Sequence, residues 1–298
     1  RDLPLFVLLG GMAGAAMFVP AVHAWVVRDL ETGRAFFYSG IAVFVFFGML
    51  AIATSTLKVR RQDRSHLITM FACILVLPAF LAIPFAEVVR DTSYLNAYFE
   101  MVSSLTTTGL TLFEAERLPQ SLHLWRAIVA WLGGFFIWTT AEAMLAALSL
   151  GGLVLISTGG STVQVAGRSV SGERLLRFAQ RLAPSYAVLT VVLWIALMIM
   201  GDAPLIAICH AMSTLSTSGI TPLGDGVAGA PAGFTGELII VLFLVFALSR
   251  MTFSADERRE GWSRLVRAPE LRLGLVLIVS LPILLLLRQG YVTYEEGG

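Results

Sequence analysis

The sequence predicts an all-α, polytopic membrane protein that contains tandem helix, pore-loop, helix repeats. Three observations predict this fold class. Hydrophobic residues make up 57% of the 298 residues, charged residues only 14%, and the mean hydropathy is +0.80, which argues against a soluble globular domain. Seven apolar segments are candidates for membrane crossings. A short motif rich in Ser and Thr occurs twice, each time between two of these segments.

The repeated motif reads EMVSSLTTTGLT from Glu100 to Thr111 and HAMSTLSTSGIT from His210 to Thr221, an offset of 110 residues. Each copy is too short and too polar to cross a membrane. We therefore interpret each as a re-entrant loop, in which a short helix enters the membrane and the chain returns in extended form. Non-helical backbone at this depth persists only where protein packs around it or where it faces water.

The hydroxyl-rich end of each copy favours an ion pathway. A run of Ser and Thr that ends at Gly can direct successive carbonyl oxygens at one axis, because Gly accepts dihedral angles that other residues avoid. A ring of such oxygens replaces the hydration shell of a cation. The alternative is an ordinary loop between helices, but two aligned copies favour the pore. The candidate filter residues are Thr106, Thr107, Thr108, Gly109, Leu110, Ser216, Thr217, Ser218, Gly219 and Ile220.

The first two apolar segments, 3–27 and 35–57, flank the short polar link VRDLETGR. We expect them to form an N-terminal transmembrane hairpin within residues 1–65. The opening stretch is longer than the core of a signal peptide, so it is expected to be a retained helix.

Residues 66–183 are expected to form the first pore repeat. Its first span, 66–88, is predicted to bend rather than break at Pro78 and Pro84. The short helix that follows directs its C-terminal end, with its partial negative charge, toward the first filter. The next apolar region, 124–157, is longer than one straight crossing requires, so we expect it to be tilted, bent or partly outside the bilayer.

Residues 184–270 are expected to form the second pore repeat, with spans over 184–201 and 237–253 on either side of the second pore helix. The polar segment 159–183 that precedes them has a basic face at helical spacing. We expect it to lie along the membrane surface or to contact a soluble partner.

Two charged residues inside apolar segments are candidate modulators of the pore. Glu142 lies in the long region of the first repeat, where an ionisable residue is a candidate functional group; the alternative is a carboxylate that faces a wet cavity or is capped by neighbouring hydroxyl groups. Arg250 lies late in its span and would oppose other cations, or its head group reaches the membrane interface. Glu100 and His210, about two helical turns from each filter Gly, are expected to anchor the pore helices rather than bind the ion.

The placement of basic residues predicts the orientation. The connections that lack the motif, 58–65, 168–181 and 258–272, carry four, four and five basic residues. Of the connections that contain it, 202–235 carries none and 89–123 carries only Arg90 and Arg117. The positive-inside rule places the basic connections in the cytoplasm and both filters at the outer face of the cytoplasmic (inner) membrane. Seven crossings satisfy this alternation, with a cytoplasmic N-terminus and an external C-terminal tail.

From about residue 66 onward the sequence resembles the Trk/Ktr/HKT superfamily of potassium transporters, and the leading hairpin resembles the extra one of bacterial Trk-type subunits. The residues that carry the resemblance are AYFEMVSSLTTTGLT, WRAIVAWLGG, CHAMSTLSTSGITP and APELR. The resemblance implies the fold of potassium-channel-like transporters, in which four repeats surround one pore and each filter keeps one Gly. Gly109 and Gly219 would be two of these glycines, and potassium would bind at the filter residues.

The sequence departs from the superfamily pattern in three ways. It shows two loops, followed by residues 271–298, which resemble the first helix of an incomplete third repeat. We expect a fragment of a longer product; a second polypeptide or a second copy that completes the pore is the alternative. Ser249 and Arg250 stand where relatives often carry paired glycines, and Glu142 stands where the family is usually apolar.

The expected function is potassium ion uptake across the cytoplasmic membrane through a pore lined by re-entrant filter loops. Potassium is the substrate, and no cofactor or structural metal is expected in this chain. The alternative is a non-conducting membrane subunit for assembly or sensing. An enzyme is not expected, because no nucleophile, base and orienting partner share a segment. The expected partners are membrane lipids, a second copy in a homodimer and, by resemblance, a cytoplasmic nucleotide-binding regulatory subunit, but no nucleic acid.

Overall fold

The computed structural model describes residues 5–54, 71–152 and 172–248, together with the single positions 274, 276, 280, 283 and 284. The regular elements in these residues are all helical, with no strand among them. Five helices are long and apolar enough to cross a membrane, and they coincide with the first five predicted spans. The all-α membrane fold is therefore confirmed. The chain divides into two compact units, Arg1–Ile240 and Val241–Gly298, and both repeated loops belong to the first.

The N-terminal hairpin consists of α1 (Leu5–Ala16), α2 (Phe18–Val26) and α3 (Leu30–Thr54). The first predicted span is interrupted at Met17, three residues before Pro20, which has no N–H to donate to the preceding turn. Opposite this span, α3 approaches so closely that a Cβ on Gly14 would lie 2.8 Å from the backbone nitrogen of Phe44. The hairpin is therefore closed by a backbone contact that only glycine permits.

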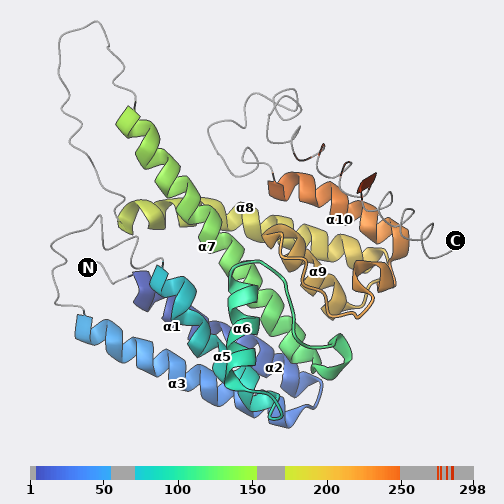
Figure 1. The fold of residues 1–298 in the computed structure, drawn as a ribbon, viewed down its shortest axis with the longest axis horizontal. Helices are drawn as coiled ribbons and strands as arrows, with labels where there is room; N and C mark the ends of the chain where they lie inside the picture. The colour runs from blue at the N-terminus through green and yellow to red at the C-terminus, as the bar shows by residue number, and fades with distance from the viewer. Residues whose placement is uncertain are drawn as a thin grey trace, which may run out of the picture. The chain divides into compact units, whose positions relative to one another are not determined.

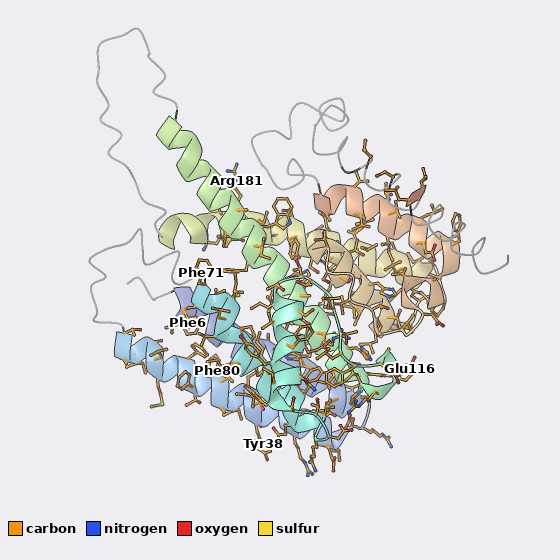
Figure 2. All side chains as sticks on the ribbon, viewed as in Figure 1. Phe6, Tyr38, Phe71, Phe80, Glu116 and Arg181 are labelled. Carbon is orange, nitrogen blue, oxygen red and sulfur yellow. The ribbon has the colours of Figure 1, made fainter. Side chains whose placement is uncertain are left out.

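Aromatic side chains join this hairpin to the first repeat. Phe80, which is labelled in Figure 2, lies 5.3 Å from Phe46 and 5.1 Å from Phe47, measured between ring centroids. Trp125 of the first repeat is completely buried, and its ring lies 5.7 Å from that of Phe36 in α3, measured between ring centroids. Burial of these large rings is the main favourable contribution to this junction.

The first repeat contains α5 (Leu77–Val88), α6 (Tyr94–Leu105), the short 3₁₀ helix η1 (Ala115–Arg117) and α7 (Gln120–Gly152). The helix α5 continues through Pro84, as predicted. The pore helix α6 begins where the Ser93 hydroxyl accepts a hydrogen bond from the amide of Asn96 at 3.3 Å, because such a cap satisfies an amide that has no partner within the helix. The helix α7 has 33 residues and is about 50 Å long at 1.5 Å per residue, which is longer than one crossing requires.

The second repeat contains α8 (Gly172–Ile199), the pore helix α9 (Pro204–Ser216), the 3₁₀ helix η2 (Gly226–Gly229) and α10 (Gly233–Leu248). The end of the polar segment 159–183, which is expected to lie along the membrane surface or to contact a soluble partner, continues into the following span, because α8 runs from Gly172 through Pro184. A proline removes one hydrogen bond from a helix, and here long helical stretches on both sides keep the axis continuous. The predicted division between repeats at residue 184 therefore falls inside α8.

The helix α7 lies between the two pore helices. Figure 1 shows it crossing from the group that contains α6 to the group that contains α8 and α9, and it packs against all three. Each pore helix therefore rests on the same long helix. The connections 58–65 and 258–272, most of the segment 271–298 and the side chains at the start of α8 lie outside the described residues.

The close contact at Gly14 generates a stability prediction. Replacement of Gly14 by Ala is expected to destabilise the protein by about 1–3 kcal/mol, because the added methyl group meets the backbone of α3 and the helices must separate. Gly11, on the same helix, has no atom within 4 Å of its Cβ position, so Gly11→Ala is the matched control and should not be destabilising. Thermal unfolding of the purified protein in detergent measures both. Equal unfolding temperatures for the two variants would contradict the contact.

Candidate functional site

The two repeated loops adopt the same backbone conformation. Thr107 and Thr217 have φ values of 56° and 54°, and Gly109 and Gly219 have φ values of 75° and 69°. A positive φ is uncommon for a residue other than glycine, so its occurrence at equivalent positions is not accidental. The sequence repeat is thus also a structural repeat.

Equivalent hydrogen bonds close both loops. The amide of Thr108 donates to the carbonyl oxygen of Ser103 at 2.9 Å, and the amide of Ser218 donates to the carbonyl oxygen of Ser213 at 3.0 Å. Each bond turns the chain back over the last turn of its pore helix. The return segment therefore starts at the C-terminal end of the helix, where the partial negative charge of the helix lies.

The hydroxyl groups of the loops bond locally. The hydroxyl oxygens of Thr106 and Thr108 are 2.8 Å apart, and those of Ser216 and Ser218 are 3.1 Å apart. By contrast, the carbonyl oxygens of residues 107, 108, 217 and 218 accept no hydrogen bond from the described residues. The groups left to bind a cation are thus main-chain carbonyl oxygens, the ligands that replace water in ion filters.

The two loops are in direct contact. A Cβ on Gly109 would lie 1.9 Å from the carbonyl oxygen of Ser218, so no side chain fits at this position. At the equivalent Gly219, no atom of the described residues lies within 4 Å of the Cβ position. Among the described residues, one side of the second loop is therefore open, whereas the corresponding side of the first loop is filled. The structure brings the predicted filter segments 106–110 and 216–220 together.

The segments that follow the two filters also approach each other. Glu116 of η1 is labelled in Figure 2, and its Oε1 atom lies 2.5 Å from the position of a Cβ on Gly224. The repeats therefore meet along their outer connections as well as at the filter loops.

The first return segment is held by a buried ion pair. The Oε2 atom of Glu100, in α6, accepts a hydrogen bond from the amide of Leu112 at 3.2 Å. Its Oε1 atom lies 2.7 Å from the Nε atom of Arg126 in α7, without hydrogen-bond alignment, and both side chains are at most 4% exposed. A buried carboxylate requires such a partner, because the loss of hydration is costly for an unpaired charge. Glu100 thus joins the pore helix, the return segment and α7.

The second return segment is held at the equivalent position by different chemistry. The Nε2 atom of His210, in α9, lies 3.0 Å from the hydroxyl oxygen of Thr221. Its Nδ1 atom lies 4.0 Å from the Oδ2 atom of Asp202, and both residues are buried. The other oxygen of Asp202 accepts from the amide of Ala232 at 2.8 Å. Both Glu100 and His210 therefore hold their loops, which agrees with the anchoring role expected from the sequence.

Arg126 and Asp202 are not among the residues predicted from the sequence. Arg126 could have been identified from the sequence, because a charged residue within an apolar segment is a candidate functional group. Asp202 stands in a short connection, where nothing in the sequence distinguishes it. The predicted modulator Glu142 lies within α7, but its side chain is outside the described residues, as is the whole of Arg250. In the described part of the chain, no three His, Cys, Asp or Glu side chains could hold a metal ion together.

Comparison with known proteins identifies relatives of this architecture. No family model matches the chain. The Trk system potassium uptake protein TrkI of Halomonas elongata is 32% identical over 197 residues, which are 61% of this chain and 39% of the relative. TrkH of Vibrio parahaemolyticus is 27% identical over 252 residues, which are 82% of this chain and 50% of that protein. These similarities bear out the resemblance to Trk-type potassium transporters that the sequence indicates.

A solved structure has a similar fold. The crystal structure of the potassium transporter TrkH from Vibrio parahaemolyticus matches with a TM-score of 0.70 and 25% sequence identity, over 84% of this chain and 50% of that chain. The Trk-family relatives are transport proteins rather than enzymes, which agrees with the prediction from the sequence. The chain spans 39% of the length of TrkI and about half of the length of the TrkH proteins of Vibrio parahaemolyticus and Escherichia coli.

The buried ion pair generates a prediction for Glu100→Gln. The amide side chain keeps an acceptor for Leu112 but leaves the charge of Arg126 buried without a counter-charge, which is expected to cost about 3–5 kcal/mol. Asp91→Asn is the matched control, because Asp91 pairs with Arg117 at the same 2.7 Å distance but is 74% exposed; it should leave stability unchanged. Unfolding of the detergent-solubilised protein by SDS measures both variants. A Glu100→Gln variant as stable as the control would contradict the assigned role of the pair.

The different surroundings of the filter glycines generate a second prediction. Alanine at either position is strained by the positive φ, but only at Gly109 does the methyl group also meet a carbonyl oxygen, that of Ser218. We expect Gly109→Ala to lower the unfolding temperature more than Gly219→Ala does. Equal effects, measured by thermal unfolding in the same detergent, would argue against the contact between the loops.

Proposed function

We propose that this chain carries potassium ions across the membrane along a path lined by Thr106–Leu110 and Ser216–Ile220. The observation that supports this most strongly is the pair of loops with equal backbone conformation and free carbonyl oxygens, in contact at Gly109 and Ser218. Carbonyl oxygens at close spacing compensate a cation for its lost water. The names of the TrkH and TrkI relatives, as potassium uptake proteins, support potassium as the cation.

The pore helices add to the attraction for a cation. Both α6 and α9 end at a filter loop, and the C-terminal end of a helix carries partial negative charge. An ion that passes inward is also driven by the membrane potential, which contributes about 2.3 kcal/mol per charge for each 100 mV. One glycine in each loop provides fewer well-formed binding positions than a longer filter, so discrimination against sodium is expected to be modest.

The open side of Gly219 indicates where the path continues. The carbonyl group of Ser218, in the second loop, fills the corresponding side of Gly109. If Gly219 is covered in the same way as Gly109, further protein would pack on its open side and complete the ring of loops around the ion path. That protein would come from a longer chain, a second polypeptide or a second copy in a homodimer.

The expected environment follows the charge distribution of the sequence. The protein would lie in the cytoplasmic membrane with its N-terminus inside and both filters facing outward. The basic connections 58–65, 168–181 and 258–272 would face the cytoplasm. There they would contact anionic lipids and a nucleotide-binding regulatory subunit.

Potassium-dependent growth of a bacterium that lacks its own potassium uptake tests this function. The intact protein should restore growth at low potassium, and Gly219→Ser should abolish that growth, because a serine disturbs the free carbonyl groups of the loop. Gly226→Ser is the matched control, since Gly226 has nearly the same φ, 70°, and also has no atom within 4 Å of its Cβ position. It lies outside the filter, so growth should persist. Equal effects of the two substitutions would remove the filter assignment.

The same experiment distinguishes the alternative function. If the unmodified protein is present in the membrane but does not restore growth, a non-conducting subunit for assembly or sensing becomes the better explanation. Direct uptake of labelled rubidium into the same cells separates transport from indirect effects on growth.

A further inference from the structure

A pair of glycines in α7 contacts the end of each pore helix. A Cβ on Gly133 would lie 2.0 Å from the carbonyl oxygen of Leu105 and 2.8 Å from its carbonyl carbon. Leu105 is the last residue of α6, directly before the first filter. The atoms in the way belong to the backbone, so rotation of a side chain cannot relieve the overlap.

The next residue of α7 makes the equivalent contact with the other pore helix. A Cβ on Gly134 would lie 2.9 Å from both the Cα and the Cβ atoms of Ser216, and 3.1 Å from the hydroxyl oxygen of Tyr186. Ser216 is the last residue of α9 and the first residue of the second filter segment. Consecutive helical residues point about 100° apart, so α7 touches both pore helices at one height, from two sides.

The helix α7 cannot move away easily at this height. The Tyr186 ring stacks on Trp131 at 5.0 Å, and its hydroxyl group donates to the carbonyl oxygen of Trp131 at 3.2 Å. The indole nitrogen of Trp131 donates in turn to the hydroxyl oxygen of Thr190 at 2.9 Å. These contacts fix α7 against α8. Any added volume at the glycine pair must therefore displace the pore helices.

The first pore helix is also fixed to α7 at a second level. The ion pair between Glu100 and Arg126 lies five residues before Leu105 and seven residues before Gly133. Two contacts on one helix face determine both the position and the tilt of α6. The contact between Gly133 and Leu105 lies nearest to the C-terminal end of α6, so it determines the position of the first filter segment.

We infer that Gly133 and Gly134 are positioning residues that set the distance between the two filter loops and thereby the discrimination between potassium and sodium. This inference rests on the proposed transport function. Neither glycine is itself one of the proposed filter residues. They act through the backbone of Leu105 and Ser216, since the separation of carbonyl ligands determines which dehydrated cation they fit.

The test compares cation ratios in Gly133→Ala and Gly134→Ala. The intact protein and each variant are expressed in cells that lack potassium uptake, and the initial rates of potassium, rubidium and sodium entry are measured and divided by the amount of protein in the membrane. We expect the potassium-to-sodium ratio to change by about tenfold in both variants, which corresponds to about 1.4 kcal/mol. A purely structural defect would lower all three rates by one factor and leave the ratios unchanged.

Gly48→Ala is the matched control. Gly48 also lies within a membrane helix, α3, but has no atom within 4 Å of its Cβ position. Alanine favours a helix more than glycine does, so this variant should show normal rates and normal ratios.

Each outcome decides between the claims. Unchanged ratios in both glycine variants, beside normal transport by the unmodified protein, overturn the inference and leave the proposed function intact. The inference is also overturned if both variants fail to reach the membrane while Gly48→Ala succeeds, because the pair would then serve assembly. Absence of cation entry through the unmodified protein removes the proposed function, and the inference with it.

Discussion

The structure depends on the hydrogen-bond partners of the two segments that follow the pore helices. Extended backbone cannot satisfy itself as a helix does, and lipid offers no donors or acceptors. In the first loop, the amide of Leu112 therefore bonds to Glu100, and the carboxylate requires the charge of Arg126 in turn. In the second loop, His210 bonds to Thr221 and lies beside Asp202. The carbonyl groups nearest the glycines accept no hydrogen bond from the described residues, and these are the groups on which the proposed function rests.

The sequence predicted those parts of the site that are encoded locally. The repeat at an offset of 110 residues located both pore helices and both filter loops, and the structure gives them one conformation. The partners Arg126 and Asp202 escaped prediction, because which distant side chain meets a buried group depends on how helices pack. The pair Gly133 and Gly134 was visible in the sequence, but its contacts with two pore helices are a property of the tertiary structure.

The fold, too, was predicted where it is encoded locally and missed where it depends on tertiary packing. The length of the apolar segments identified the first five spans, since the thickness of the bilayer sets a minimum length for each helix separately. The continuity of α8 through Pro184 was missed, because a proline signals the loss of one hydrogen bond and not the end of a helix that packing supports. The central position of α7 was likewise not evident, although its 33 residues indicated an unusual helix.

The unlike anchors of the two loops have a consequence for the exchange of one loop for the other. If the first loop replaced the second, a glutamate would stand at position 210, about as close to Asp202 as His210 is, and two buried carboxylates would repel each other. The reverse exchange would leave Arg126 opposite a histidine. Each anchor therefore suits only its own partner, so the two loops are not interchangeable parts.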